Sequence, residues 1–369
     1  MAELSPSTRL RRSPYHAATL AAGVSSFTVY NRMLLPSGYG DPDTEYARLT
    51  TGVTQWDVAA ERQVELAGPD AARLAQILSP RDLSEIEIGQ GRYVPLCDHA
   101  GTLINDPIVL KVDEDRFWIS IADSDVLFWA RAIAAERRLD VTLSEPDVSP
   151  LAVQGPKAED VVASLLGERV RRIRRFRFED AELEGIPLKV ARSGWSKQGG
   201  FELYLLDARH GEKLWNLVRE AGAPWDIGPG YPNACERIEG GLLSWGGDTD
   251  DDTNPFEVRL ERFVDLDLES EDAVVGLEAL RAIDARGPRR HQLGVALESA
   301  ELDEPIGAWR EIRVDGRLAG HMTCGIRSRA LGRDIGYALV EREHVPGAAV
   351  TVRAESGEIG GELVELPFV

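Results

Sequence analysis

Two stretches of this chain alternate apolar and polar residues and then, after a Gly-Pro pair, change to the period of a helix. The first runs from residues 64–67 through Gly68-Pro69, and the second from residues 151–154 through Gly155-Pro156. Alternation predicts a half-buried strand, and each proline fits the first helical turn, which tolerates a missing N–H. The predicted helix faces consist of Leu74, Ile77 and Leu78, and of Val161, Val162, Leu165 and Leu166. Two such units favour duplicated α+β halves.

A third pattern predicts a hairpin. Residues 188–191 and 201–206 are strand-like, and Gly199 and Gly200 supply the positive φ angles of a tight connection. Trp195, Glu202 and Tyr204 stand close together on such a unit. An aromatic wall beside a carboxylate can hold a cationic or heteroaromatic ligand. Taken alone, the pattern fits an edge hairpin with a solvated glutamate better.

The C-terminal part has a different pattern. Residues 266–288 are rich in acids and predict a helix and linker. Short strands with turn glycines follow, and their even spacing predicts a small β-barrel or sandwich. The predicted strands cover residues 293–297, 311–314, 316–320, 334–339, 349–353 and 358–365.

Composition narrows the function classes. The net charge of −20 disfavours nucleic acid and anionic membranes as partners. The three cysteines are too far apart for a disulfide framework or a Cys-x-x-Cys metal site. No segment of signal-peptide length and no run of eighteen apolar residues occurs, so we expect a cytoplasmic protein. NAD and ATP motifs are absent. The sequence is compatible with a homodimer and leaves the oligomeric state open.

Two charged segments are candidate binding sites, one for a metal ion and one for a polyanion. Residues 250–261 place acids at calcium-loop positions, but Pro255 replaces the glycine that the loop requires, so we expect no metal. Residues 169–177 contain six arginines. In an acidic protein we expect a surface strand paired with nearby acids, although a polyglutamate tail on a folate is an alternative ligand.

The hairpin sequence resembles a known family. Arg192-Ser-Gly-Trp-Ser-Lys-Gln-Gly-Gly-Phe-Glu202 is similar to Arg-Thr-Gly-Tyr-x-Gly-Glu-x-Gly-Phe-Glu of the aminomethyltransferase (glycine cleavage T-protein) superfamily. In this variant form it resembles the tetrahydrofolate-dependent dimethylsulfoniopropionate demethylases of that superfamily. Collinear matches extend along most of the chain: residues 30–36, 55–58, 79–82, 101–107, 118–123, 153–156, 233–239 and 334–339.

The resemblance implies a fold and a ligand. The expected fold is two intertwined α+β domains in residues 1–270 and a C-terminal β-barrel in residues 271–369, arranged around a folate channel. The expected cofactor is tetrahydrofolate. The implied folate-binding residues are Tyr93, Glu202 and Arg237; the implied substrate-binding residues are Arg12, Ser120, Trp195 and Tyr204.

Most of these residues also have an ordinary structural alternative. Glu202 fits a solvated strand residue, and Arg237 fits an ion pair on a helix surface. Arg12 fits an exposed terminal tail, and Tyr93 and Tyr204 fit half-buried aromatic packing. Trp195 replaces the usual tyrosine of the T-protein, and an indole is the best cation–π face for a dimethylsulfonium.

Asn105 and Asp106 occupy the position of an Asp-Asp pair in the T-protein, where the first carboxylate is catalytic. Asn105 replaces that carboxylate. Aminomethyl transfer needs help with a proton, whereas a sulfonium leaves as a neutral thioether and needs less. The replacement therefore favours methyl transfer from sulfur. Without the resemblance, a turn-stabilising side chain explains Asn105 better.

Three hypotheses follow. The first is a tetrahydrofolate-dependent demethylase of a small-molecule sulfonium. The second is a demethylase of another methylated compound, or an aminomethyltransferase, which Asn105 disfavours. The third is a folate-binding protein without turnover. Residues 244–248, Ser-Trp-Gly-Gly-Asp, depart from the Ser-Tyr-Gly-Asn-Asp of the demethylases, and this leaves the exact substrate open.

Overall fold

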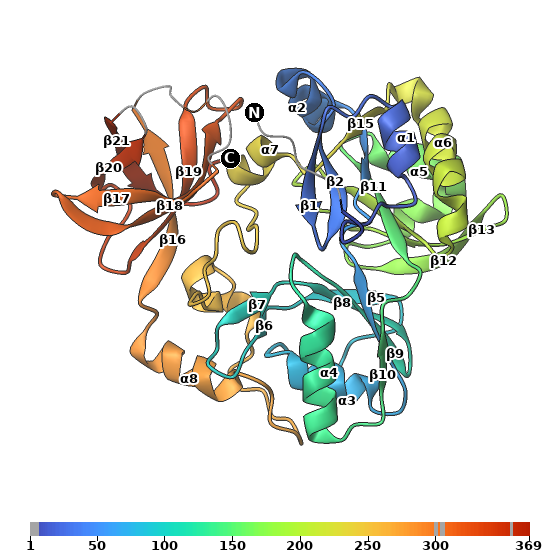
Figure 1. Cartoon of the computed structure of the whole chain (residues 1–369), viewed down its shortest axis with the longest axis horizontal. Coiled ribbons are helices and arrows are strands. Elements are labelled where there is room, and N and C mark those ends of the chain that lie inside the picture. Colours follow the sequence, from blue (N-terminus) through green and yellow to red (C-terminus); the bar gives the residue numbers. More distant parts are fainter. Residues whose placement is uncertain (1–6, 299–301, 303–306, 355–356) are drawn as a thin grey trace. The chain divides into compact units, whose positions relative to one another are not determined.

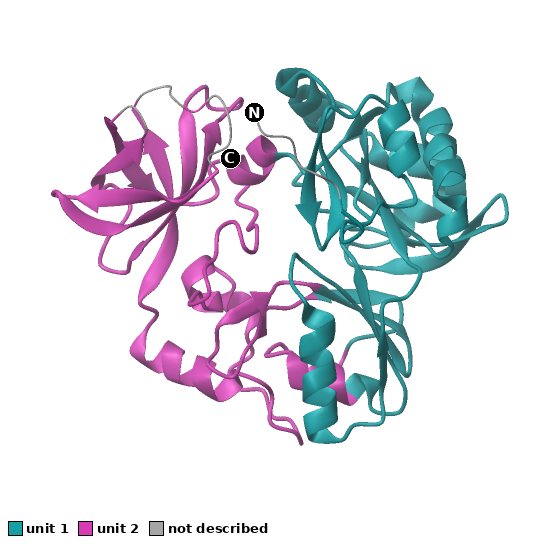
Figure 2. Cartoon of the chain, in the orientation of Figure 1, with its two compact units in different colours: residues 1–72, 86–92, 108–233 teal, residues 73–85, 93–107, 234–369 magenta. Residues whose placement is uncertain are grey.

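The computed structural model describes residues 7–298, 302, 307–354 and 357–369, so part of the N-terminal stretch used for the signal-peptide prediction, residues 1–6, lies outside the described residues (Figure 1). The chain forms two compact units that interleave along the sequence (Figure 2). Unit 1 consists of residues 1–72, 86–92 and 108–233, and unit 2 of residues 73–85, 93–107 and 234–369. The predicted boundary at 270/271 follows neither unit and stays a prediction.

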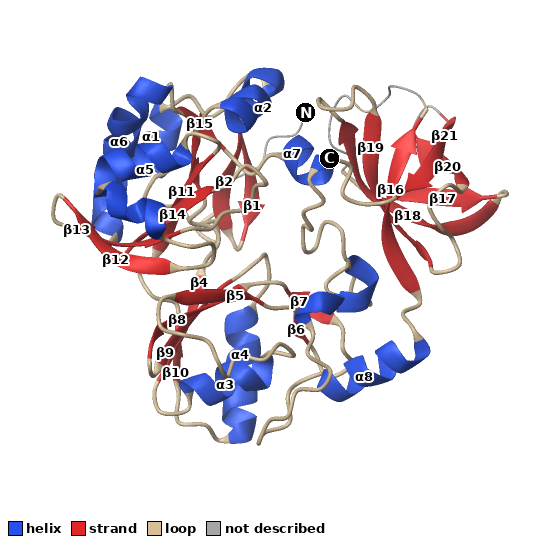
Figure 3. Cartoon of the chain, turned by 180° about the vertical axis from the view of Figure 1, so that it is seen from behind, coloured by secondary structure: helices blue, strands red, loops and turns tan. Residues whose placement is uncertain are grey.

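Unit 1 is built on two sheets (Figure 3). One has the strand order β10-β4-β9-β8-β5 and the other β12-β13-β14-β11-β3-β15. The strands of the first are β4 (Gln63–Ala67), β5 (Gln90–Tyr93), β8 (Ile108–Asp113), β9 (Arg116–Ser120) and β10 (Thr142–Ser144). Those of the second are β3 (Thr54–Asp57), β11 (Ser149–Gln154), β12 (Phe178–Leu183), β13 (Ile186–Ala191), β14 (Gly200–Leu205) and β15 (Gly228–Gly230). A ribbon of β1 (Ser26–Tyr30) and β2 (Met33–Gly38) completes the described strands of this unit.

Helices cover the second sheet and bury the main core of unit 1. The described helices of unit 1 as a whole are α1 (His16–Ala21), α2 (Pro42–Thr51), α4 (Val126–Arg137), α5 (Ala158–Leu166) and α6 (Gly211–Gly222). Leu151 and Leu203 of the sheet pack in one cluster with Val161 of α5 and Leu214 of α6. All four are fully buried, so truncating either leucine to alanine would cost about 2–5 kcal/mol.

The two β–Gly-Pro–α units are confirmed, with a correction to the role of the prolines. Helix α3 (Ala71–Leu78) and helix α5 begin two residues after Pro69 and Pro156. Each proline instead holds the second position of a β-turn, closed by the bond from Ala71 N to Gly68 O and from Ala158 N to Gly155 O. A Cβ at Gly155 would lie 2.6 Å from a backbone oxygen, which explains the glycine.

The predicted hairpin is also confirmed, but it is not at an edge. Strand β14 pairs with β13 on one side and with β11 on the other. Every residue of β14 after Gly200 is buried. The solvated-strand alternative for Glu202 is therefore wrong, because β14 is an interior strand of its sheet.

Unit 2 contains the predicted barrel. Within the described residues its strands close in the order β16-β19-β18-β17-β20-β21, a barrel and not a sandwich. Their bounds are β16 (Arg290–Leu297), β17 (Arg310–Val314), β18 (Arg317–Arg327), β19 (Asp334–Glu341), β20 (Ala349–Ala354) and β21 (Gly357–Val364). The prediction ended β18 at Gly320, whereas the strand continues through a register shift between Met322 and Cys324. At Gly320, whose φ is 153°, an added Cβ would lie 2.2 Å from the Leu339 carbonyl oxygen on β19, which explains the glycine.

The remainder of unit 2 connects to the barrel through short elements. They are α3, the pair β6 (Leu96–Cys97) and β7 (Leu103–Asn105), α7 (Ala234–Glu239) and α8 (Leu277–Arg286). Of the predicted segment 266–288, only α8 is helical, because Gly276 in the left-handed region starts the helix there. No described helix is long and apolar enough to cross a membrane.

The acidic residues of segment 250–261 form contacts within unit 2. Asn254 and Glu257 form a reciprocal cap on a 3-10 helix that begins at Pro255. The Asp250 carboxylate forms an ion pair with Arg290 on the first barrel strand, with an N–O distance of 2.6 Å. These acids therefore stabilise a turn and its connection to the barrel.

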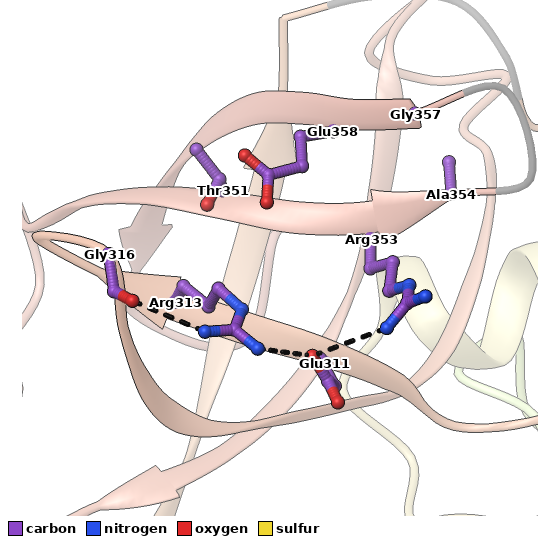
Figure 4. A pocket seen from close by; sticks show the side chains of 8 residues that line it. All are labelled: Glu311, Arg313, Gly316, Thr351, Arg353, Ala354, Gly357 and Glu358. Carbon is purple, nitrogen blue, oxygen red and sulfur yellow. Dashed lines mark hydrogen bonds and ion pairs between the residues drawn. The ribbon is translucent and has the colours of Figure 1, made fainter.

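One polar hollow of about 560 Å³ lies on the surface of the barrel (Figure 4). In it the Glu311 carboxylate contacts the guanidinium groups of Arg313, at 2.8 Å, and Arg353, at 3.9 Å. None of the predicted site residues lines this hollow. The candidate site is therefore elsewhere.

Candidate functional site

The loop that carries Trp195 is held by one buried amide. Gln154, at the end of β11, donates from Nε2 to the carbonyl oxygens of Ser193 (3.1 Å) and Phe201 (3.4 Å). Its Oε1 accepts a bond of 2.8 Å from Ser196 Oγ. A Cβ at Gly194 would lie 2.0 Å from Gln154 Nε2, so only glycine fits there. The loop 193–199 is thereby fixed, and Trp195 is half-buried on it.

Glu202 is a buried carboxylate with two protein donors. It is 4% exposed. Ser193 Oγ and Tyr204 Oη (3.3 Å) both donate to the same oxygen, Oε2. Burial raises the pKa of Glu202, while these two bonds lower it. Since Oε2 already accepts two hydrogen bonds, Oε1 is the oxygen left for a ligand. Binding a ligand through both carboxylate oxygens would require one of the two protein donors to move.

Ser120 and Trp118 of β9 lie near Tyr204. Ser120, at the end of β9, lowers the pKa of the Tyr204 hydroxyl, against the larger raising effect of burial. Trp118 of β9 lies beside Tyr204, with 6.3 Å between ring centroids. The Lys189 ammonium lies 5.8 Å from the Trp118 ring, so this aromatic group already has one cation beside it. Tyr204 is 2% exposed and is buried, not half-buried as the packing alternative assumed.

Arg12 is exposed on an anchored segment. Arg11 pairs with β2, donating from its backbone to Arg32 O at 2.8 Å, and Ser13 Oγ donates to the buried Asp57 carboxylate at 2.5 Å. Within the described residues Arg12 forms no hydrogen bond or ion pair. The Arg12 side chain is therefore exposed, as the terminal-tail alternative predicts. The backbone around it is held by hydrogen bonds of Arg11 and Ser13, which that alternative did not predict.

Unit 2 holds the other predicted residues, and Tyr93 and Asp106 meet there. Tyr93 Oη donates to Asp106 Oδ2 at 2.7 Å. Desolvation raises the pKa of Asp106 to about 7, against the lowering effect of this bond. The Tyr93 ring packs edge-on against Phe263, with 4.9 Å between centroids. A carboxyl that titrates near neutral pH is suited to proton transfer.

Asn105 is the last residue of β7 and is fully buried. The turn before that strand is stabilised by Asp98, whose Oδ1 accepts bonds from Ala100 N and Thr102 N. Asp98 therefore has a turn-stabilising role, and the same alternative for Asn105 stays a prediction. Asn105 adjoins Asp106 at the strand end.

Arg237 forms a buried ion pair. Its Nη1 lies 2.7 Å from Asp248 Oδ2, and the two side chains are 11% and 0% exposed. Asp248 also accepts bonds from Ser244 N (2.8 Å) and Thr323 Oγ1 (3.1 Å). The ion-pair alternative is thus right about the partner, but the pair is buried and not on a helix surface. It connects α7 to the 244–248 turn and to the barrel.

The arginine-rich segment is not the predicted strand. Glu168–Arg172 is a 3-10 helix. The expected pairing with acids is confirmed: Arg171 contacts Glu159, Asp160 and Glu168, Arg169 contacts Glu179, and Arg177 contacts Glu87.

Four residues with clear local roles escaped the sequence reasoning: Gln63, Gln154, Ser193 and Asp248. Gln154 and Ser193 lie inside the quoted motifs, and the adjoining glycines were a signal that a side chain passes close by. Asp248 lies in the departing 244–248 segment. Gln63 Nε2 donates to Ser120 Oγ at 2.9 Å, and nothing in the local pattern distinguished this residue.

Known proteins match this chain over nearly its whole length. A family model described as the GCVT N-terminal domain matches residues 15–268, and one described as the glycine cleavage T-protein C-terminal barrel domain matches residues 290–369. The chain is 42% identical over 358 residues to dimethylsulfoniopropionate demethylase DmdA of Ruegeria pomeroyi, covering 97% of each chain. It is 31% identical over 367 residues to an aminomethyltransferase of Rubrobacter xylanophilus, covering 97% and 94%.

A solved structure shares the whole fold. It is the glycine cleavage system aminomethyltransferase T from Bartonella henselae, with a TM-score of 0.85 over 98% of both chains. The identity of 21% supports the fold alone. The predicted α+β fold with its C-terminal barrel is thereby confirmed.

Proposed function

Because the chain belongs to the glycine cleavage T-protein family, we propose that it is a tetrahydrofolate-dependent demethylase acting on a sulfonium such as dimethylsulfoniopropionate. The observation that carries this choice is the 42% identity, over 97% of both chains, to a protein of that name. Seven aminomethyltransferase relatives are 27% to 31% identical to this chain.

In the proposed reaction the methyl–sulfur bond breaks and its electron pair stays on sulfur, which leaves as a neutral thioether. Tetrahydrofolate would supply the N5 nitrogen that takes the methyl group, and the products would be 5-methyltetrahydrofolate and a methylthio acid. The protein contributes positioning and a cation site, so no covalent intermediate on the enzyme is required.

Unit 1 offers residues that fit both ligands. Glu202 has one uncommitted carboxylate oxygen in a buried position, which suits an N–H donor of a pterin. Trp195 stands on the fixed loop after Ser193 and is proposed to face the sulfonium. Tyr204 and Ser120 are proposed to complete the substrate pocket, and the exposed Arg12 to hold the substrate carboxylate.

Unit 2 supplies the proposed catalytic carboxyl. Asp106, with a pKa of about 7, is the proposed acceptor for the proton that methylation releases. The uncharged amide of Asn105 is proposed to lie beside the reacting groups. Tyr93 and Arg237 are the proposed folate contacts of this unit, and Asp248 holds Arg237 in a fixed orientation.

A demethylase of another methylated compound is the second candidate, and Trp245 favours it. Its Nε1 donates to Leu103 O at 3.2 Å, two residues before Asn105. The indole packs in the same apolar cluster as Tyr93 and Leu103. A tryptophan here, where the demethylases that the chain resembles have tyrosine, adds bulk to the cluster that contains Tyr93, and this favours a donor of different shape.

Turnover by the purified chain tests the proposal. Tetrahydrofolate is incubated with dimethylsulfoniopropionate, betaines and methoxyaryl compounds, and 5-methyltetrahydrofolate is measured by mass spectrometry. We expect methylated folate with the sulfonium. Methylation from a betaine or methoxy compound alone would support the second candidate, and folate binding without methylation by any donor would support a binding protein.

Glu202→Ala tests the folate site directly. Loss of a hydrogen bond to a charged group should weaken tetrahydrofolate binding by about 1.5–3 kcal/mol. Glu182→Ala, on the exposed face of β12 in the same sheet, is the matched control and should leave binding unchanged. Equal affinity of both folded variants would remove the basis for the site.

A further inference from the structure

The hairpin turn between β1 and β2 has an unusual composition. Its two residues, Asn31 and Arg32, have positive φ angles of 49° and 60°. This kind of turn favours Asn-Gly, because glycine adopts the left-handed region without strain. The described turns at residues 184–185, Glu-Gly, and 315–316, Asp-Gly, have positive φ at both positions and follow that rule. An arginine where these two turns have glycine indicates that the turn has a further role.

Asn31 attaches the turn to the end of β9. The residue is 5% exposed, and its Nδ2 donates to Ala60 O at 2.9 Å and to Ala122 O at 3.1 Å. Its backbone N–H donates to Asp123 Oδ1 at 2.6 Å. Ala60 precedes β4 and Ala122 follows β9, so one amide holds the same end of this strand pair on both sides. That end carries Ser120, the last residue of β9 and a proposed substrate residue.

Arg32 attaches the turn on two sides. Its Nη2 forms an ion pair with Asp125, which precedes α4, with an N–O distance of 2.6 Å. Its carbonyl oxygen accepts a hydrogen bond from Arg11 N at 2.8 Å, and Leu34 N donates to Arg11 O at 3.1 Å. Because of these bonds, the residue before Arg12 lies along β2 in a parallel bridge.

Arg12 is thus fixed between two attached neighbours. On one side Arg11 is bonded to the turn, and on the other Ser13 Oγ donates to the buried Asp57 carboxylate at 2.5 Å. Arg12 itself is exposed. A continuous set of bonds therefore runs from the backbone beside Arg12, through the turn, to the residues that follow Ser120.

This inference rests on the proposed function, in which Arg12 binds the carboxylate of the methyl donor and Ser120 lies in the same substrate pocket. We propose that Asn31 is a positioning residue that fixes Arg12 relative to Ser120, so that the enzyme selects donors with a carboxylate at one distance from the sulfonium. A guanidinium binds a carboxylate through two parallel hydrogen bonds, and small displacements weaken this contact. Without the Asn31 side chain the turn is released from β9, and Arg12 is no longer held at that distance.

The test removes the Asn31 side chain and keeps the turn. Asn31→Gly retains a residue that adopts positive φ and deletes only the amide donors. Asp315→Gly is the matched control, because it makes the same change at the same position of a barrel turn, at an exposed side chain. Each full-length protein is assayed with tetrahydrofolate and two donors, dimethylsulfoniopropionate and ethyldimethylsulfonium, which lacks the carboxylate. The ratio of kcat/KM for the two donors measures selection of the carboxylate.

We expect Asn31→Gly to lower this ratio by about 3- to 30-fold, with the loss confined to the donor that has a carboxylate. Asp315→Gly should leave the ratio unchanged. In an Arg12→Gln background, where the carboxylate contact is gone, Asn31→Gly should have little further effect on the ratio. Hydrogen exchange in peptides that contain residues 11–13, followed by mass spectrometry, should be faster in Asn31→Gly, because the acceptor of the Arg11 amide is no longer held in place.

Other results contradict the inference. An equal loss for both donors in folded Asn31→Gly would make Asn31 a packing residue, and an unchanged ratio would show that the turn does not position Arg12. If Asn31→Gly does not fold, Asp123→Ala cuts the backbone bond of the same turn at an exposed residue and must lower the ratio. Removing that negative charge alone favours a carboxylate ligand, so a fall in the ratio identifies lost positioning.

The failure of the proposed function gives a different result. Wild-type protein that demethylates no sulfonium would contradict that function. Hydrogen exchange at residues 11–13, which needs no turnover, would then still decide whether Asn31 holds the Arg12 segment in place, and equal exchange in wild type and Asn31→Gly would overturn this.

Discussion

The hydroxyl of Tyr93 donates a 2.7 Å hydrogen bond to the carboxyl of Asp106, and burial raises the pKa of that carboxyl to about 7. The folded protein therefore binds a proton at Asp106 that the unfolded chain releases near its ordinary value of 3.8. This contribution to stability is complete below about pH 4 and is lost as the pH rises through 7.

The first prediction concerns this loss. Between about pH 4 and 7 wild type should lose up to about 4 kcal/mol of stability relative to Asp106→Asn, whose side chain does not titrate. Urea denaturation at several pH values measures the difference. Parallel stability curves for the two proteins would show that Asp106 does not titrate in this range. Tyr93→Phe, which removes a donor to the carboxylate, should steepen the loss.

The second prediction concerns Asn105. Asn105→Asp should not raise demethylation, because a neutral thioether leaving group needs no additional base. The residue is fully buried beside Asp106, so a second carboxylate there should also lower stability by about 1–3 kcal/mol. Initial rates and urea midpoints measure both effects. A large gain in rate with the added carboxylate would favour aminomethyl chemistry over the sulfonium reaction.

Arg237 carries the third prediction. Arg237→Met leaves the fully buried Asp248 carboxylate without its cation and should cost about 3–5 kcal/mol of stability. The double variant with Asp248→Asn should recover a large part of this loss, because the uncompensated charge is gone. Tetrahydrofolate affinity of that double variant separates the roles: a loss that remains supports a folate contact, and wild-type affinity would make Arg237 structural.

The sequence predicted local elements well because its patterns are local. The Gly-Pro units, the hairpin and the barrel strands depend on residues within a few positions of one another. The interior place of β14 was missed, since its pairing with β11 joins residues about fifty positions apart. Solvation of Glu202 was misjudged for the same reason.

The candidate site likewise divides into residues that local motifs locate and residues whose roles depend on long-range contacts. The family resemblance located Glu202, Tyr204 and Ser120, and the structure joins Glu202 and Tyr204 by a hydrogen bond. Gln63 and Asp248 were not found, because their importance comes from contacts with Ser120 and Arg237 that no spacing rule encodes. Burial, which sets the pKa of Asp106, is likewise a property of the folded chain.

The last prediction concerns Trp195. Its loop is held by the Gln154 amide through the backbone of Ser193 and the side chain of Ser196, so changing the indole should leave the loop in place. A sulfonium carries a diffuse charge whose methyl groups are poor donors, and an aromatic face attracts it. Trp195→Phe weakens that face, and Trp195→Leu removes it while keeping apolar bulk.

Apparent affinity for the sulfonium should therefore fall from Trp to Phe to Leu, by about 2- to 30-fold overall for a cation–π contact of about 0.5–2 kcal/mol. Tetrahydrofolate affinity should stay nearly constant, because Glu202 keeps its donors. The neutral thioether product should show little of the trend and serves as the control ligand. Calorimetric titration of the three proteins with substrate and product measures both. Equal affinity of all three for the sulfonium would make Trp195 a packing residue and would remove the cation site from the proposed mechanism.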